Sequence, residues 1–242
     1  MNMSREGGKA MIACVRWLLV VLFVVVTFPF LCLVLLLNPR KQDNLYLACK
    51  VYRAINWIFG VRVEVGGFDA IAPDRSYIYV ANHQSNHDAF VVAQALRPGT
   101  VIVGKQSLRW LPLAGQLYWL TGSLFIDRSN PRASITSLRR IATRVADSKT
   151  SLWIFPEGTR NTGQGVLPFK TGAFRIAKEM GIGIIPVTIS PAVRRIRHNA
   201  LGCTDVSIVA HRPIEADLVA SMDAKQLASY TREVVNNGLP IV

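Results

Sequence analysis

The stretch 77–90, YIYVANHQSNHDAF, joins an apolar run to a polar turn and then to a second apolar pattern. Residues 77–80 are aromatic or β-branched, which is the composition of a short buried strand. Residues 88–96, DAFVVAQAL, space their apolar side chains as a helix does, and an acidic side chain suits the positive end of such a helix. The sequence therefore predicts a buried strand, a tight polar turn and a helix that begins at Asp88.

The turn holds His83 and Asp88, five positions apart. On one continuous helix these side chains would lie roughly 140° apart around the axis and could not meet. A chain reversal, with Asp88 in the first turn of the helix, brings the carboxylate to the ring. A carboxylate on one ring nitrogen raises the basicity of the other, which suits a base that removes a proton from a hydroxyl group. The spacing alone is a weak signal, because structural or accidental pairs also show it.

The composition limits the classes of protein to which the chain can belong. Its 242 residues provide one sizeable domain with an appendage, and a hydrophobic content of 50% is typical of a membrane-associated protein. A formal net charge of +13 predicts an anionic partner, and a membrane surface or a phosphorylated substrate fits best. Nucleic acid is not an expected partner, because no nucleic-acid-binding module is recognisable. The four cysteines show no metal-ligand spacing: Cys14, Cys32, Cys49 and Cys203.

The N-terminal part of the chain is predicted to associate with a membrane. Residues 17–37 are uncharged and almost wholly apolar, and roughly 21 residues suffice to cross a hydrocarbon core of about 30 Å. Residues 45–59 follow as an amphipathic helix. A single span and a hairpin that dips into one leaflet both fit, and a core helix of a soluble protein is the less favoured third alternative. We therefore assign 1–60 to membrane-anchoring helices and 61–242 to a catalytic domain.

From residue 61 onward, short apolar runs alternate with helical patterns, which predicts an α/β fold with a mixed, largely parallel sheet flanked by helices. The predicted strands are 61–65, 77–80, 100–103, 123–126, 152–155, 184–189 and 206–210. The predicted helices are 88–96, 131–147, 171–180 and 223–236, the last with a capping box formed by Asp223 and Gln226. Because such sheets bind ligands at the carboxyl ends of their strands, polar residues that follow the strands are the functional candidates.

Basic residues follow three of these strands. Lys105 follows the strand at 100–103, Arg128 follows the strand at 123–126, and Arg160 ends the segment FPEGTR after the strand at 152–155. Arginine can bind a phosphate through two parallel hydrogen bonds, and lysine acts as a point charge. Each alone would be an ordinary solvated loop charge, but their recurrence after strands favours a shared anion pocket.

Four motifs, in their order along the chain, resemble those of the glycerolipid acyltransferases, most closely the bacterial 1-acylglycerol-3-phosphate (lysophosphatidic acid) acyltransferases. They are NHxxxxD at 82–88, the segment from GK at 104–105 to FIDR at 125–128, FPEGTR at 155–160 and IPV at 185–187. The resemblance covers about residues 82–187, and no motif position departs from the family pattern.

The resemblance implies roles for individual residues. His83, oriented by Asp88, would be the catalytic base. The other candidates would bind the acceptor: Lys105 and Arg160 at its phosphate, Arg128 more weakly, Glu157 at its glycerol phosphate, and Gly158 and Thr159 as parts of the same loop.

The implied reaction is acyl transfer from acyl-CoA or acyl-carrier protein to the sn-2 hydroxyl of lysophosphatidic acid, which yields phosphatidic acid. The family needs no cofactor and no metal, and the resemblance implies a bacterial inner-membrane protein with its catalytic domain on the cytoplasmic side, in contact with anionic lipids. Another lysophospholipid or a lyso-ornithine lipid stays open as the acceptor. A non-catalytic lipid-binding protein would not need His83 and Asp88, and a thioesterase would not need paired phosphate-binding clusters.

Overall fold

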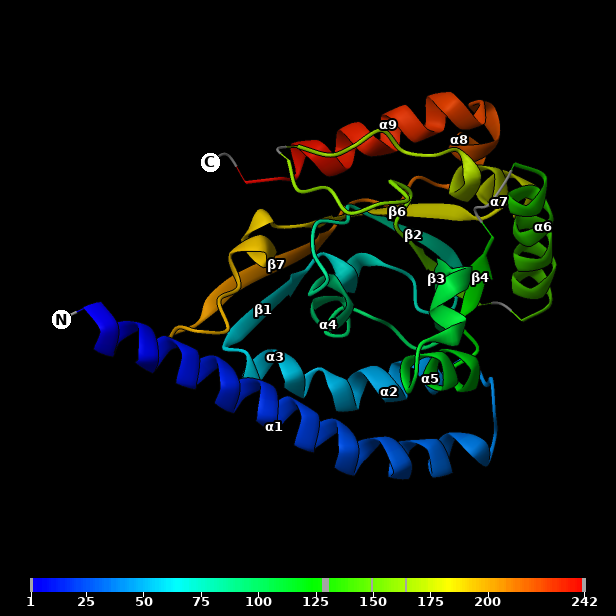
Figure 1. The fold of residues 1–242 in the computed structure, drawn as a ribbon. Coiled ribbons are helices and arrows are strands. Elements are labelled where there is room, and N and C mark those ends of the chain that lie inside the picture. The colour runs from blue at the N-terminus through cyan, green and yellow to red at the C-terminus, as the bar shows by residue number, and fades with distance from the viewer. Residues whose placement is uncertain (1, 128–130, 149, 164, 241–242) are drawn as a thin grey trace.

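The computed structural model describes residues 2–127, 131–148, 150–163 and 165–240, and contains a seven-stranded sheet in the order β1-β7-β6-β2-β5-β3-β4 (Figure 1). All seven predicted strands are present, with ends within two residues of the predicted ones. They are β1 (Val61–Gly66), β2 (Tyr77–Ala81), β3 (Thr100–Lys105), β4 (Leu124–Ile126), β5 (Ser151–Ile154), β6 (Gly183–Ile189) and β7 (Thr204–Ala210).

The direction of the strands determines where the site lies. Strands β6, β2, β5, β3 and β4 run parallel to one another, and β7 is antiparallel to β6. Strand β1 pairs in parallel with β7 at the edge of the sheet. The sheet is therefore mixed and largely parallel, as predicted. The residues that follow β2, β3, β5 and β6 gather along the edge formed by the carboxyl ends of these parallel strands.

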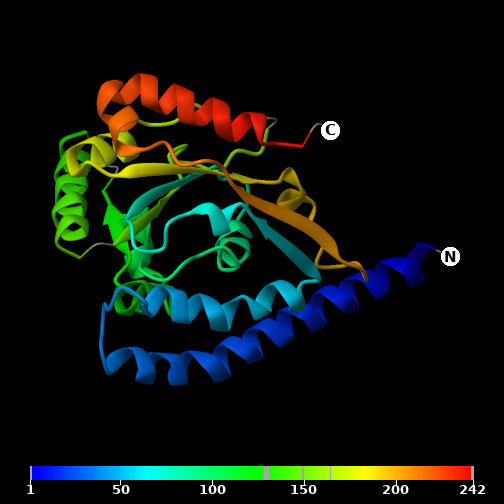
Figure 2. The same cartoon turned by 180° about the vertical axis from the view of Figure 1, so that it is seen from behind.

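Helices lie on both faces of the sheet (Figures 1 and 2). The helices on one side are α7 (Gly172–Met180), α8 (Ala216–Ser221) and α9 (Ala224–Asn237), with α6 (Pro131–Ser148) beside α7 and β4. The helices on the other side are α1 (Asn2–Leu36), α2 (Asn44–Tyr52), α3 (Ala54–Ile58), α4 (Asp88–Val92) and α5 (Ala114–Leu120).

Strand β2 shows why the apolar runs lack an alternating pattern. All five of its residues are buried. Tyr77 and Tyr79 belong to the core that includes residues of α4, whereas Ile78 and Val80 belong to the core that includes residues of α7 and α9. A strand covered on both faces needs apolar side chains on both, which produces a continuous apolar run.

The N-terminal helices form a hairpin in which α2 and α3 run back along α1 (Figures 1 and 2). The predicted helix at 45–59 is interrupted at Arg53, but its apolar face is buried against the rest of the chain. The 31-residue stretch Glu6–Leu36 is long and apolar enough to cross a membrane, and only 17% of its most apolar window is buried. The core-helix alternative therefore lacks the burial that it requires.

Three further helices differ from the prediction or were not predicted. The helix predicted at 88–96 ends at Val92, because the N–H groups of Gln94 and Ala95 bond three residues back and tighten the chain towards β3. Helices α5 and α8 have seven and six residues, too short for a clear helical period. The other predicted helices appear as α6, α7 and α9, and Asp223 and Gln226 form the predicted capping box.

Candidate active site

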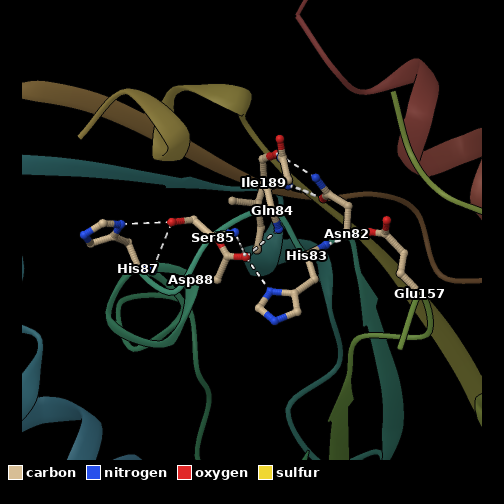
Figure 3. Close-up of polar contacts among 8 residues, drawn as sticks. All are labelled: Asn82, His83, Gln84, Ser85, His87, Asp88, Glu157 and Ile189. Atoms are coloured by element: carbon tan, nitrogen blue, oxygen red, sulfur yellow. Dashed lines mark hydrogen bonds and ion pairs between the residues drawn. The ribbon is translucent and has the colours of Figure 1, made fainter. Parts of the chain in front are cut away.

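His83 and Asp88 meet across the turn that follows β2 (Figure 3). His83 Nδ1 lies 2.6 Å from Asp88 Oδ2. Asp88 is the first residue of α4 and His83 precedes the helix, so the predicted chain reversal is present. The Asp88 side chain is 0% exposed and that of His83 is 22% exposed, so the ring alone is accessible from outside.

The contacts of Asp88 indicate which ring nitrogen carries the proton. Asp88 Oδ2 also accepts hydrogen bonds from the backbone N–H groups of Gln84 at 2.7 Å and Ser85 at 2.9 Å. An oxygen that accepts these bonds acts as a carboxylate, so His83 Nδ1 donates to it and Nε2 has a free lone pair. Within the described residues, Nε2 has no hydrogen-bond partner. Phe155 stacks on the ring with centroids 4.4 Å apart, which limits its rotation.

Two buried amide side chains attach the turn to the end of β6. Asn82 Nδ2 donates to the Ile189 carbonyl at 2.9 Å, and the Ile189 N–H donates to Asn82 Oδ1 at 2.7 Å (Figure 3). Gln84 Nε2 donates to the same carbonyl at 2.7 Å. The neighbouring strand therefore helps to set the position of the turn, which spacing within the turn could not indicate.

The loop after β5 holds the backbone of His83 from the other side. Glu157 Oε1 accepts a hydrogen bond from the His83 N–H at 2.7 Å, and the Asn161 N–H donates to the His83 carbonyl at 2.7 Å. Glu157 Oε2 accepts from the Leu167 N–H at 3.0 Å. Glu157 is 4% exposed, and this burial raises the pKa of its carboxyl group, with the two backbone hydrogen bonds acting in the opposite direction. Both of its oxygens thus bind the protein's own backbone.

Two predicted cations lie on the same edge of the sheet as His83. Lys105 is the last residue of β3, Arg160 follows β5, and β5 lies between β2 and β3. Both side chains are exposed, and neither has an ion-pair partner in the part of the chain that the structure describes. Thr159 is exposed beside Arg160. The weaker candidate, Arg128, lies outside the described residues.

Gly158 occupies a backbone conformation and a space that favour glycine. Its φ is +73°, and a Cβ at this position would lie 2.8 Å from Lys170 Nζ and 2.9 Å from Lys170 Cε. The Lys170 N–H donates to the Pro156 carbonyl at 2.9 Å. Lys170 is therefore a cation beside the FPEGTR segment, which itself ends with Arg160. Lys170 lies in the segment LPFKTGAF at 167–174, which also resembles the bacterial enzymes, but a lysine just before a predicted helix is too common to mark a site residue by itself.

Comparisons with known proteins agree with this arrangement. The profile of the family described as Acyltransferase matches residues 62–190, which include the His83 turn and the FPEGTR loop. Over 220 residues, the chain is 34% identical to the 1-acyl-sn-glycerol-3-phosphate acyltransferase of Escherichia coli strain K12, which covers 91% of this chain and 90% of that protein. The enzyme of the same name from Haemophilus influenzae is 35% identical over 200 residues, 81% of this chain and 82% of that one. The chain belongs to the acyltransferase family.

A solved structure agrees with the fold of this acyltransferase. The 1-acyl-sn-glycerophosphate (LPA) acyltransferase PlsC of Thermotoga maritima matches it with a TM-score of 0.76 at 23% identity, over 97% of this chain and 95% of that one. The agreement covers the N-terminal helices as well as the sheet. The family match and the relatives from Escherichia coli and Haemophilus influenzae show that the chain is an enzyme, so the non-catalytic alternative is set aside.

Behind the turn lies a histidine pair that the sequence patterns did not indicate. Ser85 Oγ lies 2.9 Å from His87 Nδ1, and His87 Nε2 lies 2.9 Å from His198 Nε2. The His198 ring packs against Phe59 and Trp17, with centroids 4.4 and 5.3 Å away. Burial lowers the pKa of both histidines. His198 lowers the pKa of His87 further, with Asp88 acting in the opposite direction, and Arg16 lowers the pKa of His198 further. Because the two histidines are 111 positions apart, no local motif could have paired them.

Proposed function

We propose that this acyltransferase transfers a fatty acyl group from acyl-CoA or acyl-carrier protein to the sn-2 hydroxyl of lysophosphatidic acid. The observation that carries the proposal is the 2.6 Å contact between His83 Nδ1 and the buried Asp88, which leaves His83 Nε2 as a base at the carboxyl edge of the sheet. The names of the Escherichia coli and Haemophilus influenzae relatives support lysophosphatidic acid as the acceptor.

The proposed reaction uses His83 twice. Nε2 takes the proton of the sn-2 hydroxyl while the hydroxyl oxygen attacks the carbonyl carbon of the thioester. The C–S bond then breaks, and the proton on Nε2 passes to the leaving sulfur, which gives phosphatidic acid and a free thiol. Asp88 keeps its negative charge throughout and stabilises the protonated ring, because its Oδ2 already accepts from the N–H groups of Gln84 and Ser85.

Lys105 and Arg160 are proposed to bind the acceptor phosphate. They are exposed cations at the ends of strands on the same side of β2, and an unpaired guanidinium binds a phosphate through charge-assisted hydrogen bonds. Lys170, whose Nζ lies beside Gly158, adds positive charge to the same loop. The role that we propose for Glu157 differs from the binding of the acceptor's glycerol phosphate that the resemblance implies. Since both of its oxygens bind backbone N–H groups, we assign it to positioning His83.

Helix α1 is proposed to attach the enzyme to the bacterial inner membrane, with the catalytic domain on the cytoplasmic side. Large apolar side chains of α1 are exposed along its length, including Leu18, Leu22, Val25, Phe30 and Leu33. Burial of such a surface in a bilayer removes it from water. The excess of basic residues favours a surface rich in anionic lipids.

An acceptor panel tests the proposed reaction. The detergent-purified protein receives labelled acyl-CoA or acyl-carrier protein together with lysophosphatidic acid, other lysophospholipids or a lyso-ornithine lipid. Label in phosphatidic acid supports the proposal. Label in another lipid alone would replace the acceptor, and no transfer from either donor would contradict the proposed reaction.

A further inference from the structure

The segment after Lys105 exposes four large apolar side chains. It comprises the 3-10 helix η2 (Gln106–Trp110), the connecting residues 111–113 and helix α5. Trp110 is 78% exposed, and three further residues are between 46% and 48% exposed: Leu111, Leu113 and Trp119. We name these four residues the η2–α5 patch. Apolar side chains that cluster in this way mark an interaction surface more often than single exposed residues do.

The charges around the patch indicate which kind of partner it binds. No acidic residue occurs between Lys105 and Ser123. The Arg109 guanidinium lies over the Trp110 ring, 5.7 Å from its centroid, and the Arg109 side chain is exposed. Tryptophan beside arginine is typical of the boundary between lipid headgroups and acyl chains, where the ring is half apolar and the cation meets phosphates.

The patch continues the apolar surface of α1. On the inner side of α5, Leu117 and Leu120 pack against Leu31 and Leu35 of α1. The N–H of Arg40, just after α1, donates to the Leu120 carbonyl at 2.8 Å. In both views α5 lies beside the C-terminal half of α1 (Figures 1 and 2). The exposed side of α5 therefore borders the exposed apolar residues of that half of α1.

The backbone holds the patch in one shape. A Cβ at Gly115 would lie 2.2 Å from the Arg109 carbonyl oxygen, so only glycine lets η2 approach α5 this closely. Leu113 has a φ of +62°, which a branched residue rarely adopts, and yet its apolar side chain is half exposed. Leu113 is the central residue of a γ-turn, in which the Ala114 N–H donates to the Pro112 carbonyl at 2.7 Å, so this turn holds an apolar side chain in a half-exposed position.

We propose that the η2–α5 patch inserts into the surface of an anionic lipid bilayer as a second membrane contact beside α1. This inference rests on the membrane association proposed above. The apolar side chains enter the outer part of the acyl region, and Arg109 lies among the headgroup phosphates. Lys105 directly precedes η2, which carries Trp110 of the patch, so the contact holds the proposed phosphate-binding end of β3 at the level where the phosphate of a membrane-bound acceptor lies.

The test is fluorescence quenching of the full-length protein in vesicles of equal parts phosphatidylcholine and phosphatidylglycerol. One set carries bromine near the headgroup end of the acyl chains, and bromine quenches those of the five tryptophans that contact lipid. Trp110→Phe removes a highly exposed ring and keeps the fold. Removal of a quenched tryptophan lowers the quenched fraction of the emission, whereas removal of an unquenched one raises it.

We expect Trp110→Phe and Trp119→Phe each to lower the quenched fraction. The control Trp153→Phe removes a ring that is 1% exposed in the core and must raise it. A higher quenched fraction in Trp110→Phe would overturn the proposal. Sedimentation would then distinguish a patch that faces water from one that faces a second copy of the chain. Quenching requires no acyl transfer, so failure of the patch and failure of the proposed reaction give different results.

A second variant tests the role of charge. Wild-type quenching should be stronger in the mixed vesicles than in phosphatidylcholine alone, and Arg109→Gln should reduce this difference. An undiminished difference in Arg109→Gln would remove the anionic lipid from the proposal.

Discussion

Glu157 Oε1 accepts a hydrogen bond from the backbone N–H of His83 at 2.7 Å, which ties the FPEGTR loop to the residue that carries the base. The second oxygen accepts from the Leu167 N–H at 3.0 Å. From its buried position, the carboxylate therefore links two parts of the connection between β5 and α7 to the turn that follows β2. A glutamate that acts in this way affects the reaction through the place and orientation of the His83 ring.

Glu157→Gln should lower kcat by roughly 10- to 100-fold while the KM for the acceptor stays nearly unchanged, because an amide can accept only one of the two N–H groups and the base is displaced. Acceptor titrations of the purified variant give both constants, and Glu157→Asp, with a shorter side chain, serves for comparison. A raised KM with an unchanged kcat would show instead that Glu157 binds the acceptor directly.

Gly158→Ala should reduce both stability and activity. The positive φ costs about 1–2 kcal/mol for a residue with a side chain, and the Cβ meets Lys170 Nζ in addition. Gly181→Ala is the matched control, because Gly181 has a φ of +62° with nothing within 4 Å of its Cβ position. Thermal unfolding in detergent and the acyl-transfer rate are measured for both. Equal losses of activity in the two variants would remove the specific role of the Gly158 turn.

Arg160→Ala should raise the KM for lysophosphatidic acid by about 10- to 100-fold, as expected when a charge-assisted hydrogen bond is lost. The acceptor KM of Arg160→Lys should lie between those of Arg160→Ala and the wild type, because lysine keeps the charge but cannot form two parallel hydrogen bonds with the phosphate. Arg62→Ala is the control, since Arg62 pairs with Asp205 on β1 and β7, away from the loop. If the acceptor KM is the same in Arg160→Ala and Arg62→Ala, Arg160 does not bind the phosphate.

The His87–His198 pair should make stability depend on pH. Burial holds both pKa values below 6.5, so as pH falls below 6.5 the unfolded chain binds protons that the folded chain does not. The stability present above pH 6.5 is lost as pH falls towards the folded pKa values. The unfolding midpoint should therefore drop on acidification, and less steeply in the double variant His87→Gln/His198→Gln. His211 and Glu157 titrate in both proteins and cancel in the comparison; identical slopes would contradict the prediction.

Features that depend on residues close together in the sequence, such as strands and helix caps, could be predicted from it. The central strands could be predicted because a buried parallel strand is a continuous apolar run, and β1 because its apolar and polar residues alternate. Asp223 could be predicted because a capping box spans only three residues. Helix geometry excluded a pairing of His83 with Asp88 on one continuous helix, and the motifs downstream favoured the reversal that brings them together. Contacts between residues far apart in the sequence could not be predicted, because no local pattern marks them. Asn82 reaches Ile189 over 107 positions, and the exposed patch around Leu113 depends on a backbone conformation that leucine rarely adopts.

The acyl-transfer rate of His83→Ala tests the central claim most directly, measured with lysophosphatidic acid beside the wild type and the control His211→Gln, which keeps a nitrogen near Thr188. Removal of a general base should lower kcat by at least about 100-fold, with the unfolding midpoint and membrane binding unchanged. The control should keep most of its activity. Near-normal turnover by His83→Ala would contradict the account, because no other base is proposed at this edge of the sheet.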